Sequence, residues 1–181
     1  MKNIQQVVET HKFQNRVALH MMMEDFLTLD EGKADPVILD MLKKGEFETG
    51  AKEFKDSLSK SKHKEMLTDY SVGELKKMKL FKLKGYNIGF ALKKKDGKYA
   101  DIVAVHNNEP SIRGIGVDLM KTAIANGGTF LDHFDIPKLS DLYSSLGFKE
   151  YDRDAFDPQY DEGGKFAAKY GELDIIYRKI K

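Results

Sequence analysis

The chain of 181 residues contains no cysteine. It can therefore form no disulfide, no thiolate zinc site and no cysteine nucleophile, which fits a reducing compartment and predicts a cytoplasmic protein. The first six residues lack the apolar segment of a secretory signal, and no apolar run approaches the roughly 20 residues of a membrane helix. These absences predict a soluble protein that is not exported and does not contact a membrane.

The chain has 30 Lys and Arg residues and 29 Asp and Glu residues, so neither sign of charge dominates and the formal net charge is +1. A balance of this kind argues against a dedicated nucleic-acid partner. Lysines recur at residues 60–64 without interleaved aromatic residues, so we interpret them as a solvated face, with a nucleic-acid contact as the alternative.

Several catalytic signatures are also missing. The five histidines include no pair at i, i+4 that could bind zinc, and no acidic loop has calcium spacing, so we predict no metal. The serine-hydrolase pattern G-x-S-x-G and the P-loop pattern G-x-x-x-x-G-K-[ST] do not occur. Metal-dependent, P-loop and serine-hydrolase chemistry are therefore disfavoured.

The apolar content of 41% suits one globular domain, or a core domain with an added subdomain. Residues 10–29 have the apolar spacing of an amphipathic helix. Asp35 and Pro36 predict the start of a second helix that ends at Gly45. Its expected buried face consists of Val37, Ile38, Met41 and Leu42. Helical spacing recurs from Phe47 to Leu58, so residues 1–70 are predicted to be a helical N-terminal extension.

From residue 71 the pattern changes. Ser71 and Glu74 have the spacing of a capping box and predict one short helical turn. Residues 79–83, 86–92 and 99–106 are rich in aromatic and branched side chains, and Asp96-Gly97 is a turn signal, which together predict a β-hairpin or meander. Gly89 within a strand indicates a bulge or a close backbone approach, more simply explained by packing than by a ligand.

The stretch from residue 101 to residue 120 is predicted to be a strand, a glycine turn at Gly114 and Gly116, and a helix. Residues 129–134 form the next expected strand, which makes a βαβ unit with a parallel pair. Glycines at the start of a helix leave backbone N–H groups and the positive end of the helix dipole open to an anion such as phosphate. A further helix is expected to open at Pro137 and end at Gly147, with strands at 148–151 and 173–177.

Residues 75–177 resemble the GNAT acetyltransferase superfamily through two motifs. Ser111-Ile112-Arg113-Gly114-Ile115-Gly116 is similar to its acyl-CoA pyrophosphate loop, Q/R-x-x-G-x-G/A, with Ser111 in place of Gln or Arg. Residues 142–148, Leu-Tyr-Ser-Ser-Leu-Gly-Phe, resemble its L-Y-x-x-x-G-F segment, and Ile136 stands where the family often has Asn. Tyr-Asn-Ile-Gly-Phe-Ala-Leu, Val-His-Asn-Asn and the tail resemble small GNAT-like proteins encoded by bacteriophages.

The resemblance implies an α/β (α+β) fold with a mixed, mostly antiparallel twisted sheet and flanking helices over residues 71–181. It implies an acetyl-CoA-dependent N-acetyltransferase that acts on a protein or small-molecule amine, with acetyl-CoA as cosubstrate. The residues that would hold acyl-CoA are Val105, Arg113, Gly114, Ile115, Gly116 and Val117. Tyr143 maps onto the tyrosine that protonates the departing thiolate, although its helical spacing equally fits a buried core tyrosine.

Acetyl transfer also needs a base, and His106 is the first candidate because its reference pKa is near 6.5. Glu109 follows it, and on the neighbouring strand only one of Asp132 and His133 can face a shared cleft. The alternative function is a non-catalytic GNAT-like phage binding protein or virion component, located in the host cytoplasm or the virion. The N-terminal helices and the tail after Asp154 could form an acceptor pocket, a homo-oligomer or virion contact, or a cover over the core.

Overall fold

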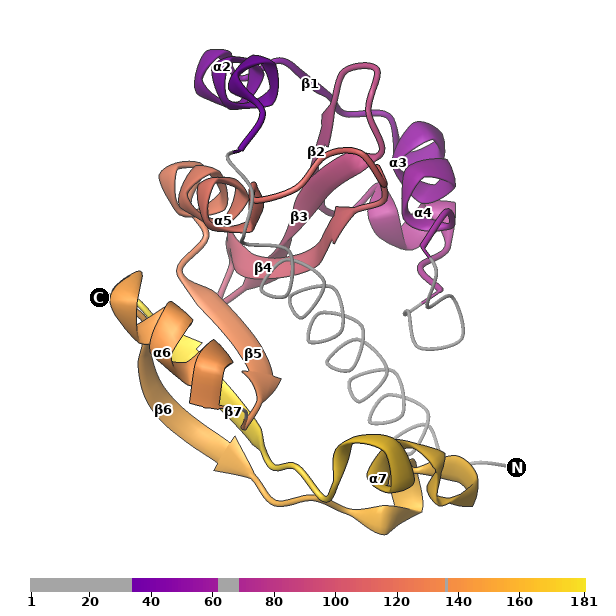
Figure 1. Ribbon diagram of the computed structural model, residues 1–181, viewed down its shortest axis with the longest axis vertical. Coiled ribbons are helices and arrows are strands. Elements are labelled where there is room, and N and C mark those ends of the chain that lie inside the picture. Colours follow the sequence, from indigo (N-terminus) through magenta and orange to yellow (C-terminus); the bar gives the residue numbers. More distant parts are fainter. Residues whose placement is uncertain (1–33, 62–68, 136) are drawn as a thin grey trace.

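The computed structural model describes residues 34–61, 69–135 and 137–181 (Figure 1). The helix expected over residues 10–29 and the position of Ile136 lie outside these ranges. Most of the lysine-rich segment at residues 60–64 lies outside them as well.

Seven strands form one open sheet in the order β1-β2-β3-β4-β5-β7-β6. Neighbouring strands run antiparallel except β4 and β5, which run parallel. The coarse prediction of a mixed, mostly antiparallel sheet is therefore confirmed. The bounds are β1 (Phe47–Glu48), β2 (Lys79–Leu83), β3 (Ile88–Lys95), β4 (Lys98–Asn107), β5 (Phe130–Phe134), β6 (Lys149–Asp154) and β7 (Ile175–Lys179).

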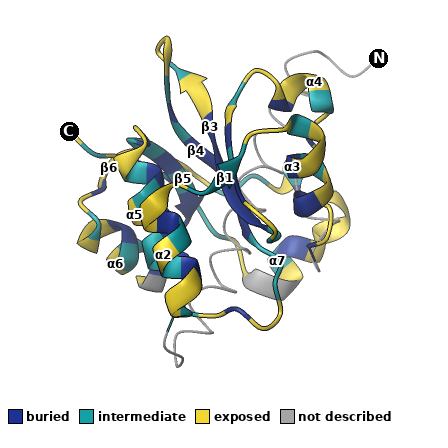
Figure 2. Ribbon diagram, turned by 90° about the horizontal axis from the view of Figure 1, so that it is seen from above, coloured by how far each residue is buried: buried dark blue, intermediate teal, exposed yellow. Residues whose placement is uncertain are grey.

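Helices cover both faces of the sheet. Figure 2 shows α2, α5 and α6 on one side, which we call the α5 face, and α3, α4 and α7 on the other, the α3 face. Their bounds are α2 (Pro36–Lys44), α3 (Ala51–Leu58), α4 (Val72–Leu75), α5 (Gly116–Ala125), α6 (Pro137–Ser145) and α7 (Lys165–Tyr170), with 3-10 turns at Pro158–Tyr160 and Glu162–Gly164. None of the helices in the described part of the chain has the length and apolar character of a membrane span.

The ends of α2 follow the predicted signals. The Asp35 carboxylate accepts a hydrogen bond from the Val37 N–H at 2.8 Å, Pro36 opens the helix, and Gly45 closes it at φ +67°. The buried face is narrower than expected, because Val37 is 59% exposed and Ile38 and Leu42 carry the burial. The prediction for Val37 was wrong because residues 38 and 42, four apart, form the inward stripe and Val37 lies beside it.

Phe47 corrects the expectation of a continuous helical pattern from residue 47 to residue 58. It lies in β1, pairs with Leu83, and packs edge-on against Phe81 at 5.5 Å between ring centroids. Gly45 ends α2, and α3 starts only after Gly50, so the intervening segment is extended and joins the sheet edge. Buried apolar side chains of α2 and α3 belong to the same core as β2–β5. The described part of the expected N-terminal extension therefore packs into one core with the sheet.

Two turn signals are confirmed. Ser71 and Glu74 form a full capping box at the start of α4. Asp96 and Gly97, at φ +50° and +79°, make the tight turn between β3 and β4. The tail differs from expectation because α7 was not predicted, and its Phe166 ring packs 4.7 Å from Phe134.

The parallel strands β4 and β5 separate soon after they meet. Their register contains the single pair Asp101 and Phe130, supported by a 2.8 Å hydrogen bond from the Thr129 N–H to the Ala100 carbonyl. Beyond that pair β4 continues to Asn107 and β5 to Phe134 without pairing to each other. Figure 1 shows β5–β7 turning away from β1–β4. The carboxyl ends of β4 and β5 separate in this region, which we call the diverging end of the sheet.

Candidate functional site

The β4 strand is distorted where it leaves β5. Gly89 pairs with His106 and Ala91 with Val103, so Ala104 and the fully buried Val105 together stand opposite the single residue Phe90. This is a β-bulge, and Ala104 has φ +51°, a strained value for a residue with a side chain. Non-glycine residues in this region are costly and concentrate at functional sites.

Gly89 is required on the partner strand. A Cβ atom there would lie 2.5 Å from the Phe81 carbonyl oxygen and 3.2 Å from the His106 ring. The predicted bulge and the predicted close approach are both present, since the glycine permits the His106 ring to lie over β3.

His106 is completely buried between the bulge and α3. Its Nδ1 lies 2.9 Å from the Ala104 carbonyl oxygen and its Nε2 2.8 Å from Ser57 Oγ. A carbonyl can only accept, so Nδ1 carries the proton and the Ser57 hydroxyl donates to Nε2. Burial lowers the pKa of His106 to about 4, against the opposing effect of the Ala104 carbonyl. The neutral imidazole joins α3 to the bulge, and its predicted role as base stays a prediction.

Side-chain amides fix the turn between β4 and the glycine loop. The Glu109 carboxylate accepts from the Asn87 N–H at 2.6 Å and from the Asn87 amide at 2.8 Å. Asn107 Nδ2 donates to the Ile112 carbonyl at 2.8 Å, and Asn108 Nδ2 donates to the Ser57 carbonyl at 2.8 Å. The sequence predicted Glu109 as a neighbour of the base. In the structure its carboxylate fixes this turn by binding Asn87.

The glycine loop leads into an uncapped helix. Gly114 has φ +69°, and no side chain caps α5 at Ile115. The first bond within α5 runs from the Leu119 N–H to the Ile115 carbonyl at 2.8 Å. The backbone N–H groups of Gly116 and Val117 therefore have no acceptor inside the helix and lie at its positive end. Arg113 is exposed just before them. The loop has the properties of an anion site.

Tyr143 lies on the buried side of α6, fully enclosed. Its ring lies 4.9 Å from the His133 ring and 6.2 Å from the Phe148 ring, centroid to centroid. Within the described residues its hydroxyl has no hydrogen-bond partner. Burial, with help from the charge of Asp132, raises the pKa of Tyr143 above its usual value, so the phenol stays protonated and can donate.

His133 and Asp132 lie on opposite faces of β5, as strand alternation requires. The Nε2 of His133 accepts from Arg178 Nε at 2.7 Å, and its Nδ1 donates to the Phe134 carbonyl at 2.6 Å. Arg178 also donates to Ser144 Oγ at 3.2 Å. Burial lowers the pKa of His133 to about 4, and the Arg178 charge adds to this effect. His133 thus ties β5, β7 and α6 together as a neutral ring.

Tyr70 was not predicted from the sequence. It is 6% exposed, and its hydroxyl has no hydrogen-bond partner within the described residues. Burial raises the pKa of Tyr70, and the charges of Asp101 and Asp132 raise it further. The charge of Asp132 on β5 thus raises the pKa of both Tyr70 and Tyr143. No motif marks Tyr70, and only the fold brings it within reach of that charge.

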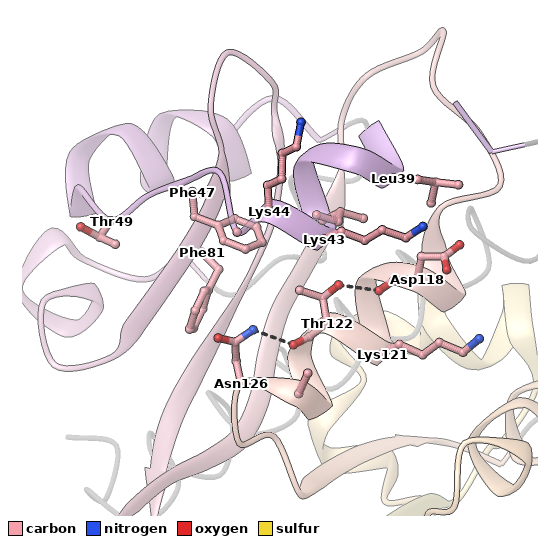
Figure 3. A pocket seen from close by; sticks show the side chains of 13 residues that line it. Leu39, Lys43, Lys44, Phe47, Thr49, Phe81, Asp118, Lys121, Thr122 and Asn126 are labelled. Atoms are coloured by element: carbon pink, nitrogen blue, oxygen red, sulfur yellow. Dashed lines mark hydrogen bonds between the residues drawn. The ribbon is translucent and has the colours of Figure 1, made fainter. Parts of the chain in front are cut away.

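A separate groove of about 650 Å³ lies on the α5 face between α2, β1, β2 and α5 (Figure 3). Phe47 and Phe81 line one wall, and Lys43 and Lys121 lie on α2 and α5. Thr122 and Asn126 donate hydrogen bonds to backbone carbonyls of α5 itself. The groove contains none of the residues predicted from the sequence to bind or react.

Among residues 34–61, 69–135 and 137–181, no group of three or more His, Asp or Glu is arranged to hold a metal ion. Neither a protein-family model nor a curated protein matches this chain. The functional assignment therefore rests on the residues themselves.

Proposed function

We propose that the chain is a GNAT-like, acetyl-CoA-dependent N-acyltransferase that transfers an acetyl group to an amine. The observation that carries the proposal is the buried, protonated Tyr143 hydroxyl at the diverging end of the sheet, which has no hydrogen-bond partner among the described residues. A buried hydroxyl without a partner costs about 1–3 kcal/mol, and such an exception in a packed core calls for a functional reason.

The glycine loop supports acyl-CoA as the cosubstrate. The N–H groups at the start of α5 and the exposed Arg113 guanidinium would hold the pyrophosphate, and Gly114 lets the backbone approach it. The pantetheine arm is an extended chain with two amides, and it would pair with the edge of β4 that β5 does not use beyond Asp101. Val105 belongs to this edge.

The reaction has three requirements. The amine attacks the thioester carbonyl to form a C–N bond, backbone N–H groups at the bulge stabilise the oxyanion, and the C–S bond then breaks. Tyr143 gives its proton to the departing thiolate, while the proton of the attacking ammonium passes to a base or water. To act directly as the base, His106 would have to release its hydrogen bond with Ser57. In this proposal His106 is therefore a positioning residue that holds the β-bulge in place.

In this proposal the acceptor is an amine. Its protonated form is a cation, which would be attracted to the carboxylates near the point where β4 and β5 separate. Asp101 and Asp132 both act electrostatically on the Tyr70 hydroxyl. An ammonium group is attracted to carboxylates of this kind, whether it belongs to a protein or to a small molecule.

The alternative is a GNAT-like phage binding or virion-associated protein without catalysis. It is supported by Ser111, which is exposed at the position of the motif's Gln or Arg, and by His106, whose two nitrogens are both engaged. A homo-oligomer or virion contact would then replace turnover as the function.

Calorimetry with acetyl-CoA and a thiol-release assay with a panel of amines test the two functions together. The enzyme proposal expects binding and amine-dependent release of CoA. Binding without release for any amine would favour the non-catalytic alternative. Absence of binding at about millimolar acetyl-CoA, by protein shown to be folded, would refute the acyl-CoA assignment.

A further inference from the structure

Lysines gather at the end of the sheet opposite the glycine loop. β2 and β4 begin there at Lys79 and Lys98, β3 ends there at Lys95, and β7 ends there at Lys179. The hairpin tip at residues 93–98 carries four lysines and one aspartate, so its charge of +3 exceeds the +1 of the whole chain. The net charge of the whole chain is close to zero and therefore does not reveal this strongly basic edge of the sheet.

Aromatic rings alternate with these lysines. The Nζ atoms of Lys79 and Lys94 each lie 5.2 Å from the centroid of the Tyr99 ring. Lys95 Nζ lies 4.9 Å from the Phe130 centroid. The Tyr151 ring lies 5.7 Å from Lys95 Nζ and 5.1 Å from Lys179 Nζ. We call the set the lysine–aromatic edge: Lys79, Lys94, Lys95, Lys179, Tyr99, Phe130 and Tyr151.

The edge is open to a partner. Tyr151 is 39% exposed, and Lys79, Lys94 and Lys179 are exposed as well. The salt bridges found within the described residues involve other cations: Lys44, Lys55, Lys82 and Arg153. Ring contacts worth about 0.5–1 kcal/mol each at exposed sites hold Lys79, Lys94 and Lys179, so a phosphate can recruit them at small cost. Lys95 is half-buried, and Tyr151 and the charges of Asp101 and Asp96 also act on it.

We propose that the lysine–aromatic edge binds single-stranded nucleic acid. The lysines contact phosphates, and a base stacks on Tyr151, which lies on the same face of the sheet as Phe130, Lys95 and Lys179. Any base can stack there, since every base offers a flat π face. An acidic peptide would use the lysines but leave the rings without a partner. A duplex keeps its bases stacked inside and leaves the rings equally unused.

The rings on the Tyr151 face lie close together. The Phe130 and Tyr151 centroids are 6.0 Å apart, and Lys95 Nζ lies 4.9 Å and 5.7 Å from them. This cluster offers a base of a short single strand one platform with Lys95 and Lys179 beside it. The site is independent of the proposed acyltransferase, since it lies at the other end of β4.

The test is fluorescence anisotropy with a labelled oligothymidine of about 12 nucleotides at about 50 mM salt. The wild-type protein is expected to bind, with a slope of log affinity against log salt of about −3 for four phosphate contacts. Lys95→Glu with Lys179→Glu should weaken binding at least tenfold. Tyr151→Ala should weaken it roughly fivefold and leave the salt slope unchanged, because it removes stacking and no charge.

The matched control is Lys43→Glu with Lys121→Glu, which makes the same charge change on exposed lysines of α2 and α5. It should alter affinity less than twofold. An equal loss in this control, or no binding by folded wild-type protein, would overturn the proposal. Competition by polyglutamate or by duplex DNA as effective as by unlabelled oligothymidine would assign the edge to an acidic protein or a duplex instead. Acetyl-CoA binding, measured in parallel, reports separately on the proposed enzyme.

Discussion

The two ends of the sheet differ in how far their polar side chains are exposed to solvent. At the diverging end, Tyr70, Tyr143, His106 and His133 are all buried, and the hydroxyls of the two tyrosines lack partners within the described residues. At the lysine–aromatic edge the charges are exposed, and aromatic rings lie beneath them.

The difference shows what each end can do. Burial shifts pKa values and strengthens hydrogen bonds, which suits chemistry on one small group. Exposed lysines gain little from individual contacts but sum their charge over a distance, which suits a long polyanion. In the two proposals, the same strands therefore carry a reaction site at one end and a docking surface at the other.

The largest expected effect is that of Tyr143→Phe on turnover. Loss of the general acid should lower kcat by roughly 10²- to 10⁴-fold, with acetyl-CoA affinity unchanged. Stability should stay level or rise, because the change removes a buried hydroxyl that has no partner in the part of the chain that the structure describes. Thiol-release kinetics and urea denaturation measure the two effects. A destabilised variant with unchanged kcat would make Tyr143 a purely structural residue.

Gly114→Glu should weaken acetyl-CoA binding roughly ten- to several-hundred-fold. A carboxylate about 4 Å from a phosphate adds about 1–4 kcal/mol of repulsion between the aqueous and near-surface limits. Gly163→Glu is the matched control, because Gly163 has φ +72° against +69° for Gly114 and imposes the same backbone strain. Calorimetry on both variants checks the prediction. An equal loss in both would mean that strain, and not the anion site, sets the affinity.

Low pH should destabilise the folded protein because two buried histidines at the diverging end become protonated on unfolding. His106 and His133 have folded-state pKa values of about 4 against 6.5 for the free side chain. Between these values the unfolded chain binds more protons, so stability falls as pH drops from about 6.5 to 4. At pH 5 each histidine should cost about 2 kcal/mol relative to pH 7.

Urea denaturation at pH 7 and pH 5 measures this loss, and His133→Gln should remove about half of it. Oligothymidine binding to the folded protein should change little over the same range, because the lysine–aromatic edge contains no histidine. A pH dependence that His133→Gln leaves intact would contradict the assignment of the loss to buried neutral imidazoles.

Local signals predicted most elements of the fold. Caps, turn glycines and apolar spacing located α2, α4, α5, α6 and the strands of the hairpin, because each is set by a few neighbouring residues. Phe47 was misassigned because its spacing to Ala51 and Phe54 mimics a helix, while its actual partners, Phe81 and Leu83, lie over 30 residues away. Long-range pairing is invisible to periodicity.

The candidate site could be predicted only in part. Gly114, Gly116 and Tyr143 carry recognisable motifs, so their elements were found. Tyr70 and the pair of Ser57 with His106 were missed, because a hydroxyl becomes informative only when the fold buries it beside a particular partner. The lysine–aromatic edge was missed for the same reason, since its members come from six separate strands and the total charge does not reveal that they lie together.

The smallest expected effect belongs to Asp96→Asn at the tip of the lysine–aromatic edge. Asp96 has φ +50°, a conformation that asparagine adopts readily, and Asn-Gly is a favoured pair for this hairpin turn, so stability should not change. Removing the one carboxylate among four lysines should tighten oligothymidine binding roughly two- to threefold and leave acetyl-CoA affinity unaltered. Anisotropy and calorimetry on one preparation check both halves. Tighter binding of acetyl-CoA would show that the two ends share one electrostatic field, whereas a response confined to the oligonucleotide would establish that they act separately.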